Sequence, residues 1–297
     1  MIGRVALLQE AGHAEEGFDI TSMILHHLAD SHELELPFGR VIHLPQFPPV
    51  QIGPLTLDFS ITKHVVFLAL AALLVAIVLI LAARGAKREH ESGAGRGPKG
   101  AANVVEAFIL YLRDEVALKN IGHGGEKFVP YIVAVFFFIL FSNLLGLLPW
   151  GASPTGNISV TAVLAAMTFV IVEYAGMREL GWRGYAKTIF YAPEGMSLAM
   201  KVPMMIIMTP VEFLGKVTKP FALAIRLYAN MTAGHAVVLA LTGLLVMAGM
   251  ANRLFIAPAP LIMAVGIMLL EIFVAFLQAY IFAMLSSVFI GLIRHSH

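Results

Sequence analysis

Five long apolar stretches constrain this chain more than any other feature of its sequence. They cover residues 65–83, 128–148, 158–175, about 203–250 and about 258–293. A helix that crosses a membrane needs about 20 mostly apolar residues. Only 13% of the residues are charged, about half the share that is usual in a soluble domain. We therefore predict an all-α, polytopic membrane protein with about five spanning helices.

Lysine and arginine alternate between the two sides of the predicted spans. The segment before the first span has eight acidic and three basic residues, whereas residues 84–99 carry five basic ones. Residues 150–157 have no charge, and four basic residues follow the third span. Because basic residues gather on the inner side of a membrane, we expect the N-terminus outside and the C-terminus inside, with Arg253 as the exception. Residues 1–63 then form an outer segment and residues 64–297 the membrane domain.

Two segments outside the spans have patterns of their own. Residues 103–118 place apolar side chains at helical spacing and charged ones on the other faces, which predicts an amphipathic helix at the inner interface. The first sixty residues mix short apolar runs with prolines, and we expect a short interfacial helix near Ile24–Leu28 followed by an extended segment. The apolar run Val5–Leu8 is too short for the core of a signal peptide, so no cleaved leader is expected.

Two local patterns do not predict a ligand site. Residues 95–100 match the GxGxxG spacing of dinucleotide sites, but they follow no predicted strand and contain Pro98. The strand–turn–helix through which that motif binds a dinucleotide is therefore not expected here. The histidines His26, His27 and His32 are more typical of a solvated outer segment than of a metal site. We expect neither a cofactor nor a bound metal.

Arg226 is the most costly residue for a membrane helix to hold. It lies in the fourth apolar stretch, and arginine keeps its proton in essentially any protein setting. Placing arginine at the centre of a bilayer costs between ~3 and ~10 kcal/mol, so such a residue is expected to be paired, hydrated or used. Its helical neighbours Ala222, Leu223, Ala229 and Asn230 include no carboxylate. An acidic partner would have to come from another span.

The last two apolar stretches are separated only by a short polar break, which predicts an antiparallel hairpin of two long helices. With the turn centred near residue 254, residues whose numbers sum to about 508 lie at the same depth. Asn230 then comes level with Gln278, and His235 lies about half a turn from Glu271. Arg226 comes level with residue 282, in a sequence that contains no acid.

The polar residues of this hairpin divide into two groups around Arg226. At ~1.5 Å per residue, His235 lies about 13 Å outward of Arg226 and Glu212 about 21 Å inward. The outer group comprises Asn230, His235, Glu271 and Gln278. Glu212 marks the inner side, with Lys216 and Lys219 nearby. Because histidine and glutamate can take up and release protons, we predict an outer polar path that holds water.

A fixed positive charge between two polar regions prevents a proton from passing straight through and attracts an ionised carboxylate. No acid of this chain is expected at the depth of Arg226, so a carboxylate on a partner chain is the natural missing group. A structural ion pair and ordinary interhelical hydrogen bonds are the alternatives at the level of single residues. At the level of the protein, a self-contained proton or ion transporter would need an acid near Arg226 and repeated sets of spans. A purely structural scaffold would not need the matched polar residues.

Three segments resemble subunit a of F-type ATP synthases. Residues 219–235, KPFALAIRLYANMTAGH, are similar to the arginine motif of that family, and residues 277–282, LQAYIF, to its motif in the last helix. Residues 142–149, SNLLGLLP, are similar to its second span. The resemblance covers most of the chain from about residue 100 onward.

The resemblance implies a stator subunit beside a rotating ring of c subunits. Arg226 would face the ring carboxylates and keep protons from short-circuiting between two aqueous half-channels. Asn230, His235, Glu271 and Gln278 match positions of the outer half-channel, and Glu212 matches an acid of the inner one. In some members the histidine and the acid at positions 235 and 271 are exchanged, which leaves the pair intact. The resemblance also implies b-type stalk subunits as partners, steeply tilted last helices and no nucleotide site. The absence of a transit-like segment favours a bacterial inner membrane.

Overall fold

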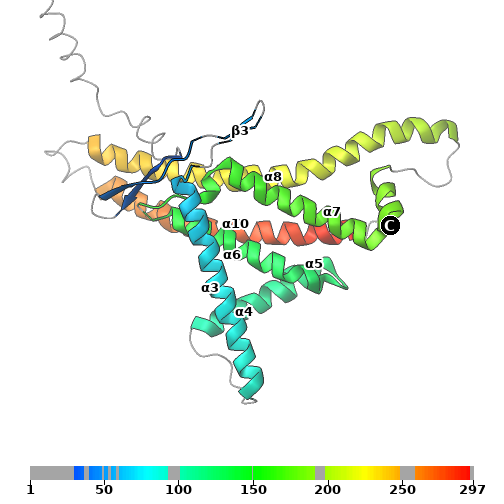
Figure 1. Ribbon diagram of the computed structural model, residues 1–297, viewed down its shortest axis with the longest axis horizontal. Helices are drawn as coiled ribbons and strands as arrows, with labels where there is room; N and C mark the ends of the chain where they lie inside the picture. Colours follow the sequence, from blue (N-terminus) through cyan, green and yellow to red (C-terminus); the bar gives the residue numbers. More distant parts are fainter. Residues whose placement is uncertain are drawn as a thin grey trace, which may run out of the picture.

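The computed structural model describes residues 30–36, 40–48, 50–52, 55–57, 60–92, 101–148, 150–190, 198–247 and 258–294. Five long apolar helices in these ranges are long enough to cross a membrane. They are α3 (Lys63–Ser92), α6 (Val129–Gly146), α7 (Ile158–Ile189), α8 (Leu198–Met247) and α10 (Pro258–Arg294). The predicted polytopic α-helical fold is confirmed (Figure 1).

Hydropathy located the spans well but not the ends of the helices. α7 continues past Ala175 to Ile189 and includes Arg178, Arg183 and Lys187, three of the basic residues that follow the predicted third span. Gly181 interrupts its helical geometry with φ 67° and ψ 171°, a conformation that glycine adopts at little cost because it has no Cβ. A helix can continue beyond an apolar segment because water satisfies its polar side chains there, so the end of the apolar run does not mark the end of the helix.

Four short strands lie among the described residues before α3, where the sequence predicted an extended segment but not its pairing into hairpins. β1 (Glu33–Leu36) pairs antiparallel with β2 (Arg40–His43), and β3 (Val50–Ile52) with β4 (Leu55–Leu57). An isolated two-stranded hairpin is marginal on its own, and the first hairpin is tied to α3 by a backbone hydrogen bond of 2.9 Å from Lys63 N to Ser31 O. The helix expected near Ile24–Leu28 lies outside the described residues.

The segment predicted as an amphipathic helix over residues 103–118 is helical, and the helix extends beyond both of its ends. α4 (Ala101–Tyr111), the π-helix η1 (Leu112–Leu118) and α5 (Lys119–Ile121) follow one another directly. Leu112 and Val116 are fully buried, whereas Val104, expected on the same face, is 71% exposed. The buried part of the apolar face packs on other helices, α6 among them, and the location of this helix at a membrane interface stays a prediction.

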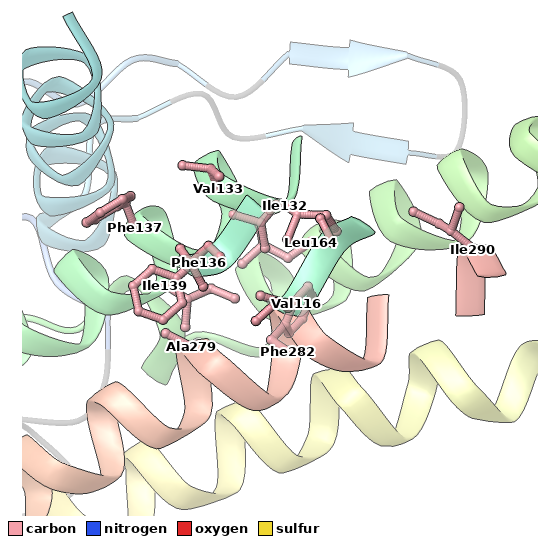
Figure 2. Close-up of a cluster of buried hydrophobic side chains, with 14 of the residues drawn as sticks. Val116, Ile132, Val133, Phe136, Phe137, Ile139, Leu164, Ala279, Phe282 and Ile290 are labelled. Atoms are coloured by element: carbon pink, nitrogen blue, oxygen red, sulfur yellow. The ribbon is translucent and has the colours of Figure 1, made fainter. Parts of the chain in front are cut away.

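The hydrophobic core is centred on α6, as Figure 2 shows. Ile132, Phe136 and Ile139 are completely buried, and Ala279 and Phe282 of α10 belong to the same cluster. A helix that is apolar on all sides is typical of a position surrounded by other helices. α6 therefore holds α10 in place, and α10 in turn positions the polar residues of the long hairpin.

α8 and α10 form the predicted antiparallel hairpin, and α3 crosses them steeply in Figure 1. Two contacts define their register. Gly234 lies against the Glu271 carboxylate, and the Lys219 ammonium lies 5.7 Å from the centroid of the Phe289 ring. These pairs of residue numbers sum to 505 and 508, so the predicted value of about 508 is confirmed. The turn between the helices lies outside the described residues.

Candidate functional site

Arg226 lies on an exposed face of α8. It shares this face with Ala222, Ala229, Asn230 and Ala233, which follow one another at helical intervals. In the described part of the chain, no residue forms a hydrogen bond or an ion pair with the guanidinium group. A charge that faces lipid is costly, and small side chains beside it allow another helix to approach closely. The face is therefore suited to contact with another protein in the membrane.

The hairpin provides no acid at the level of Arg226. Its register places residues 279–282 of α10 opposite Arg226, and this sequence, Ala-Tyr-Ile-Phe, contains no carboxylate. Ala279 and Phe282 are buried in the core rather than turned toward the exposed face. The described part of the hairpin thus has no carboxylate at this level, and an acidic partner for Arg226 on another chain stays a prediction.

His235 has a backbone oxygen beside each ring nitrogen. Nε2 lies 2.6 Å from the carbonyl oxygen of Gly146 in α6, and Nδ1 lies 3.2 Å from the carbonyl oxygen of Met231 in its own helix. Neutral imidazole has one N–H and donates to only one of these oxygens, whereas the protonated ring can donate to both. The ring can thus keep at least one hydrogen bond in either protonation state.

Glu271 packs against the backbone of Gly234, the residue that precedes His235. A methyl group on residue 234 would collide with the Glu271 carboxylate, so this close approach requires glycine. The Oε1 atom of Glu271 is buried and has no hydrogen-bond partner among the described residues. A buried carboxylate oxygen without a donor is costly, so Glu271 is an expensive residue at this position of α10.

The other two residues of the predicted outer path lie in different surroundings. Asn230 is exposed beside Arg226, whereas Gln278 is only 8% exposed. No hydrogen bond in the described structure joins them, although the hairpin register gives them the same depth. Depth follows from the register alone, but the direction of a side chain depends on how each helix is rotated about its axis. The structure places the Glu271 carboxylate against Gly234, the neighbour of His235 in the sequence, and leaves Asn230 on the exposed face.

A buried polar cluster fixes the connection between α6 and α7 near His235. The side-chain oxygen of Asn143 accepts a hydrogen bond of 2.5 Å from the Thr155 hydroxyl, and the amide donates to the Ala275 carbonyl oxygen at 3.4 Å. The hydroxyls of Ser153 and Thr155 are 2.7 Å apart. In the sequence, Asn143 belongs to residues 142–149, the segment that resembles the ATP synthase family, and no role was predicted for it. A polar residue at the end of an apolar span was the signal that could have identified it.

A cavity of about 130 Å³ lies at the other end of the hairpin, between α7, α8 and α10. Its charged lining residues are Glu173, Glu212, Lys216 and Lys219. Glu212 is exposed at its rim, with the two lysines nearby as the sequence predicted. Glu173 is only 8% exposed. The cavity is therefore a second polar region, and Arg226 lies between it and His235 along α8.

Glu173 is held by partners from two helices. The Tyr185 hydroxyl donates a hydrogen bond to its carboxylate, and the Lys216 ammonium lies 3.8 Å from the same oxygen. Lys216 also donates to the Thr188 hydroxyl at 3.1 Å. Sequence spacing could not join these residues, because Lys216 comes from α8 and the others come from α7.

Lys216→Met should destabilise the chain by about 3–5 kcal/mol, because the variant leaves a buried carboxylate without its cation. The side chains of Lys216 and Glu173 are only 12% and 11% exposed. The double variant Glu173→Gln/Lys216→Met should recover most of the loss. Thermal denaturation of the solubilised complex measures both, and an equal loss in the single and double variants would show that the two charges do not interact.

The described residues contain no group of three or more histidine, cysteine or acidic side chains that could hold a metal ion. His32 is placed beside the Ile61 carbonyl oxygen, with its Nδ1 at 3.3 Å. His26, His27 and residues 95–100 lie outside the described residues.

Fold and site together define a multi-pass membrane protein in which an exposed arginine separates two polar regions along one helix. The sequence model of the family described as ATP synthase A chain matches residues 65–291. The chain is 46% identical over 292 residues to ATP synthase subunit a 2 of Chlorobaculum tepidum, covering 95% of this chain and 78% of that protein. It is 43% identical over 269 residues to ATP synthase subunit a of Chloroherpeton thalassium, covering 90% and 75%. With ATP synthase subunit a of an Anaeromyxobacter species the identity is 40% over 319 residues, covering 97% and 74%.

The chain belongs to the ATP synthase subunit a family. It is thus a multi-pass component of the membrane sector CF(0), where ion transport is linked to ATP synthesis.

Proposed function

We propose that this chain supplies two aqueous half-channels and the arginine barrier through which protons reach and leave a rotating c-ring. Proton flow along this route would be coupled to ATP synthesis. Membership of the subunit a family supports the proposal. The observation that carries it is the exposed, unneutralised Arg226 between the region of His235 and Glu271 and the cavity of Glu173 and Glu212.

The distance between the two polar regions is too long for a proton to cross without a carrier. At about 1.5 Å per residue, His235 lies about 13 Å from Arg226 in one direction along α8, and Lys216 about 15 Å in the other. The charge of Arg226 repels an excess proton at the midpoint. A proton that enters at one region must therefore leave this chain, and a carboxylate on a mobile neighbour is the group that could carry it.

The exposed face of α8 is the proposed contact with the c-ring. A protonated ring carboxylate is neutral and can move through lipid, whereas an ionised one is stabilised beside Arg226. The alanines on this face leave room for the ring helices. Arg226 would in this way force each carboxylate to exchange its proton with one polar region before passing to the other.

The same proposal places the chain in its complex and membrane. Its further partners are the b-type subunits of the peripheral stalk. Its location is the plasma membrane of a bacterium, with the N-terminal segment outside and the C-terminus inside. His235 and Glu271 then belong to the outer half-channel and Glu212 to the inner one.

Ala229→Cys should form a disulfide with a cysteine placed beside the membrane carboxylate of the c subunit. The chain has no cysteine of its own, and Ala229 is exposed on the face of Arg226. A disulfide forms only when the two Cα atoms come within about 7 Å. Mild oxidation of membranes that contain the whole complex, followed by electrophoresis, detects the linked pair. Leu73→Cys is the control, because Leu73 is 55% exposed but lies on α3. Comparable yields from both positions would contradict the proposed ring contact.

A further inference from the structure

A small cavity with two histidines in its lining joins the beginning of α3 to His235. Its volume is about 30 Å³, and its lining includes His64, Thr232 and His235, together with residues of the connection between α6 and α7. A space of this size accommodates about one or two water molecules. Two histidines from different helices thus line the same water-sized space, although no spacing in the sequence pairs them.

His64 connects this cavity to an acid on the other side of its ring. The Nδ1 atom of His64 lies 2.7 Å from Oδ1 of Asp30, and the side chains are 8% and 33% exposed, respectively. Partial burial acts to raise the pKa of Asp30, but the hydrogen bond and the charge of His64 outweigh it and hold that pKa below its ordinary value. Asp30 is therefore an ionised group that solvent reaches, in contact with a buried histidine.

Backbone hydrogen bonds hold the segment of Asp30 against the start of α3. The amide of Lys63 donates to the Ser31 carbonyl oxygen at 2.9 Å, and the amide of Leu44 donates to the His32 carbonyl oxygen at 2.8 Å. These bonds do not depend on the side chain of His64. The position of Asp30 is thus set by the fold of the N-terminal segment.

We propose that Asp30 and His64 form the outer entrance of the proton path and pass protons through the cavity to His235. The inference rests on the proposed function, because it extends the outer half-channel of that proposal to residues that line its mouth. It gives the N-terminal segment a part in proton transfer in addition to its packing on α3.

The proton transfer from solvent to His235 needs no further reactant. Asp30 takes a proton from solvent and gives it to Nδ1 of a neutral His64 ring whose own proton is on Nε2. The protonated ring then releases its Nε2 proton to water in the cavity, and rotation of the ring, which turns the bare nitrogen back toward Asp30, resets it for the next proton. One of the two ring nitrogens of a neutral His235 has no hydrogen and can accept the proton from that water. Glu271, packed on Gly234 beside His235, is the next acid along the path.

The decisive variant is His64→Gln, studied in the whole complex reconstituted in liposomes. Glutamine can still donate a hydrogen bond to Asp30 but cannot carry a proton. Because a positioned proton-transfer group contributes about a hundredfold, we expect ATP synthesis driven by an imposed pH gradient to fall at least about tenfold. His32→Gln is the matched control, since His32 lies in the same segment but does not line the cavity, and its rate should equal that of the unmodified complex.

Rescue by imidazole separates proton transfer from packing. In His64→Ala, added imidazole should restore a substantial part of the rate when it is supplied on the side of the N-terminal segment. A normal rate in His64→Gln would overturn the inference, and so would a reduced rate that imidazole does not restore in His64→Ala.

A second pair of variants covers the case in which changes at His64 prevent assembly. Asp30→Asn should lower the rate and Asp30→Glu should preserve it, and equal rates in these two variants would overturn the inference.

Arg226→Ala, measured in parallel, distinguishes a failure of the proposed function from a failure of the proposed entrance. If Arg226→Ala still pumps, the proposed function fails. If it does not pump while His64→Gln works normally, only the entrance is wrong.

Discussion

Replacing Arg226 with alanine should abolish ATP-driven proton pumping by the assembled complex. The guanidinium group is exposed on α8 and has no partner among the described residues, so its charge acts on whatever approaches that face. At about 4 Å and an effective dielectric constant of about 20, one unit charge changes the energy of another by roughly 4 kcal/mol. This corresponds to about a thousandfold in rate. Without the charge, ring carboxylates could pass from one polar region to the other without first exchanging a proton.

The measurement is acidification of liposomes that contain the complete complex, with passive proton leak recorded in the same vesicles. Pumping should fall below detection while leak rises or stays constant. Arg178→Ala is the matched control, because Arg178 lies on α7, where its guanidinium group donates a hydrogen bond of 3.3 Å to the Tyr174 hydroxyl. Coupled pumping that survived in Arg226→Ala would exclude the arginine barrier.

Gly234→Ala should lower proton flux by roughly tenfold, since displacing a group from a packed site costs about 1–3 kcal/mol. The added methyl group would occupy the position of the Glu271 carboxylate and displace it from its place against the backbone of residue 234. Because the variant keeps every ionisable group, its effect would come from the position of the carboxylate alone. ATP synthesis by reconstituted complexes measures the loss.

Two further variants test whether the effect of Gly234→Ala comes from its contact with Glu271. Gly215→Ala introduces the same change in the same helix, but its new methyl group meets no atom within 4 Å, so flux should be unaffected. Gly234→Ala combined with Glu271→Asp should recover part of the flux, because the shorter side chain withdraws the carboxylate from the methyl group. A normal rate in Gly234→Ala, or the same loss in Gly215→Ala, would refute the importance of this contact.

The fold was predictable where it depends on transfer of side chains from water to lipid. An apolar stretch of sufficient length must form a helix in a membrane, because every backbone polar group needs a partner there. The five spans and the antiparallel hairpin followed from this rule. The hairpins β1–β2 and β3–β4 and the extension of α7 to Ile189 did not, because outside lipid the backbone can also pair with water and many conformations are possible.

The candidate site was predictable in part for a related reason. Arg226 attracted attention because its charge is costly in an apolar helix, and depth along α8 followed from a constant rise per residue. The pairing of His235 with Glu271 was expected from the hairpin register. Contacts between helices that are distant in the sequence, such as Lys216 with Glu173 and His64 with the cavity at His235, carry no such periodic signal.

The sequence by itself determined that this chain lies in a membrane, that its last two helices form a hairpin, and that Arg226 has no acid of its own at its depth. These properties depend on composition and on distance along a helix, both of which can be read from the order of residues. Only the tertiary structure decided which polar groups meet. It turned Arg226 and Asn230 to the exposed face, buried Gln278 and joined Asp30 to His64. Those outcomes depend on how each helix rotates and packs against its neighbours, which is set by contacts among all the helices at once.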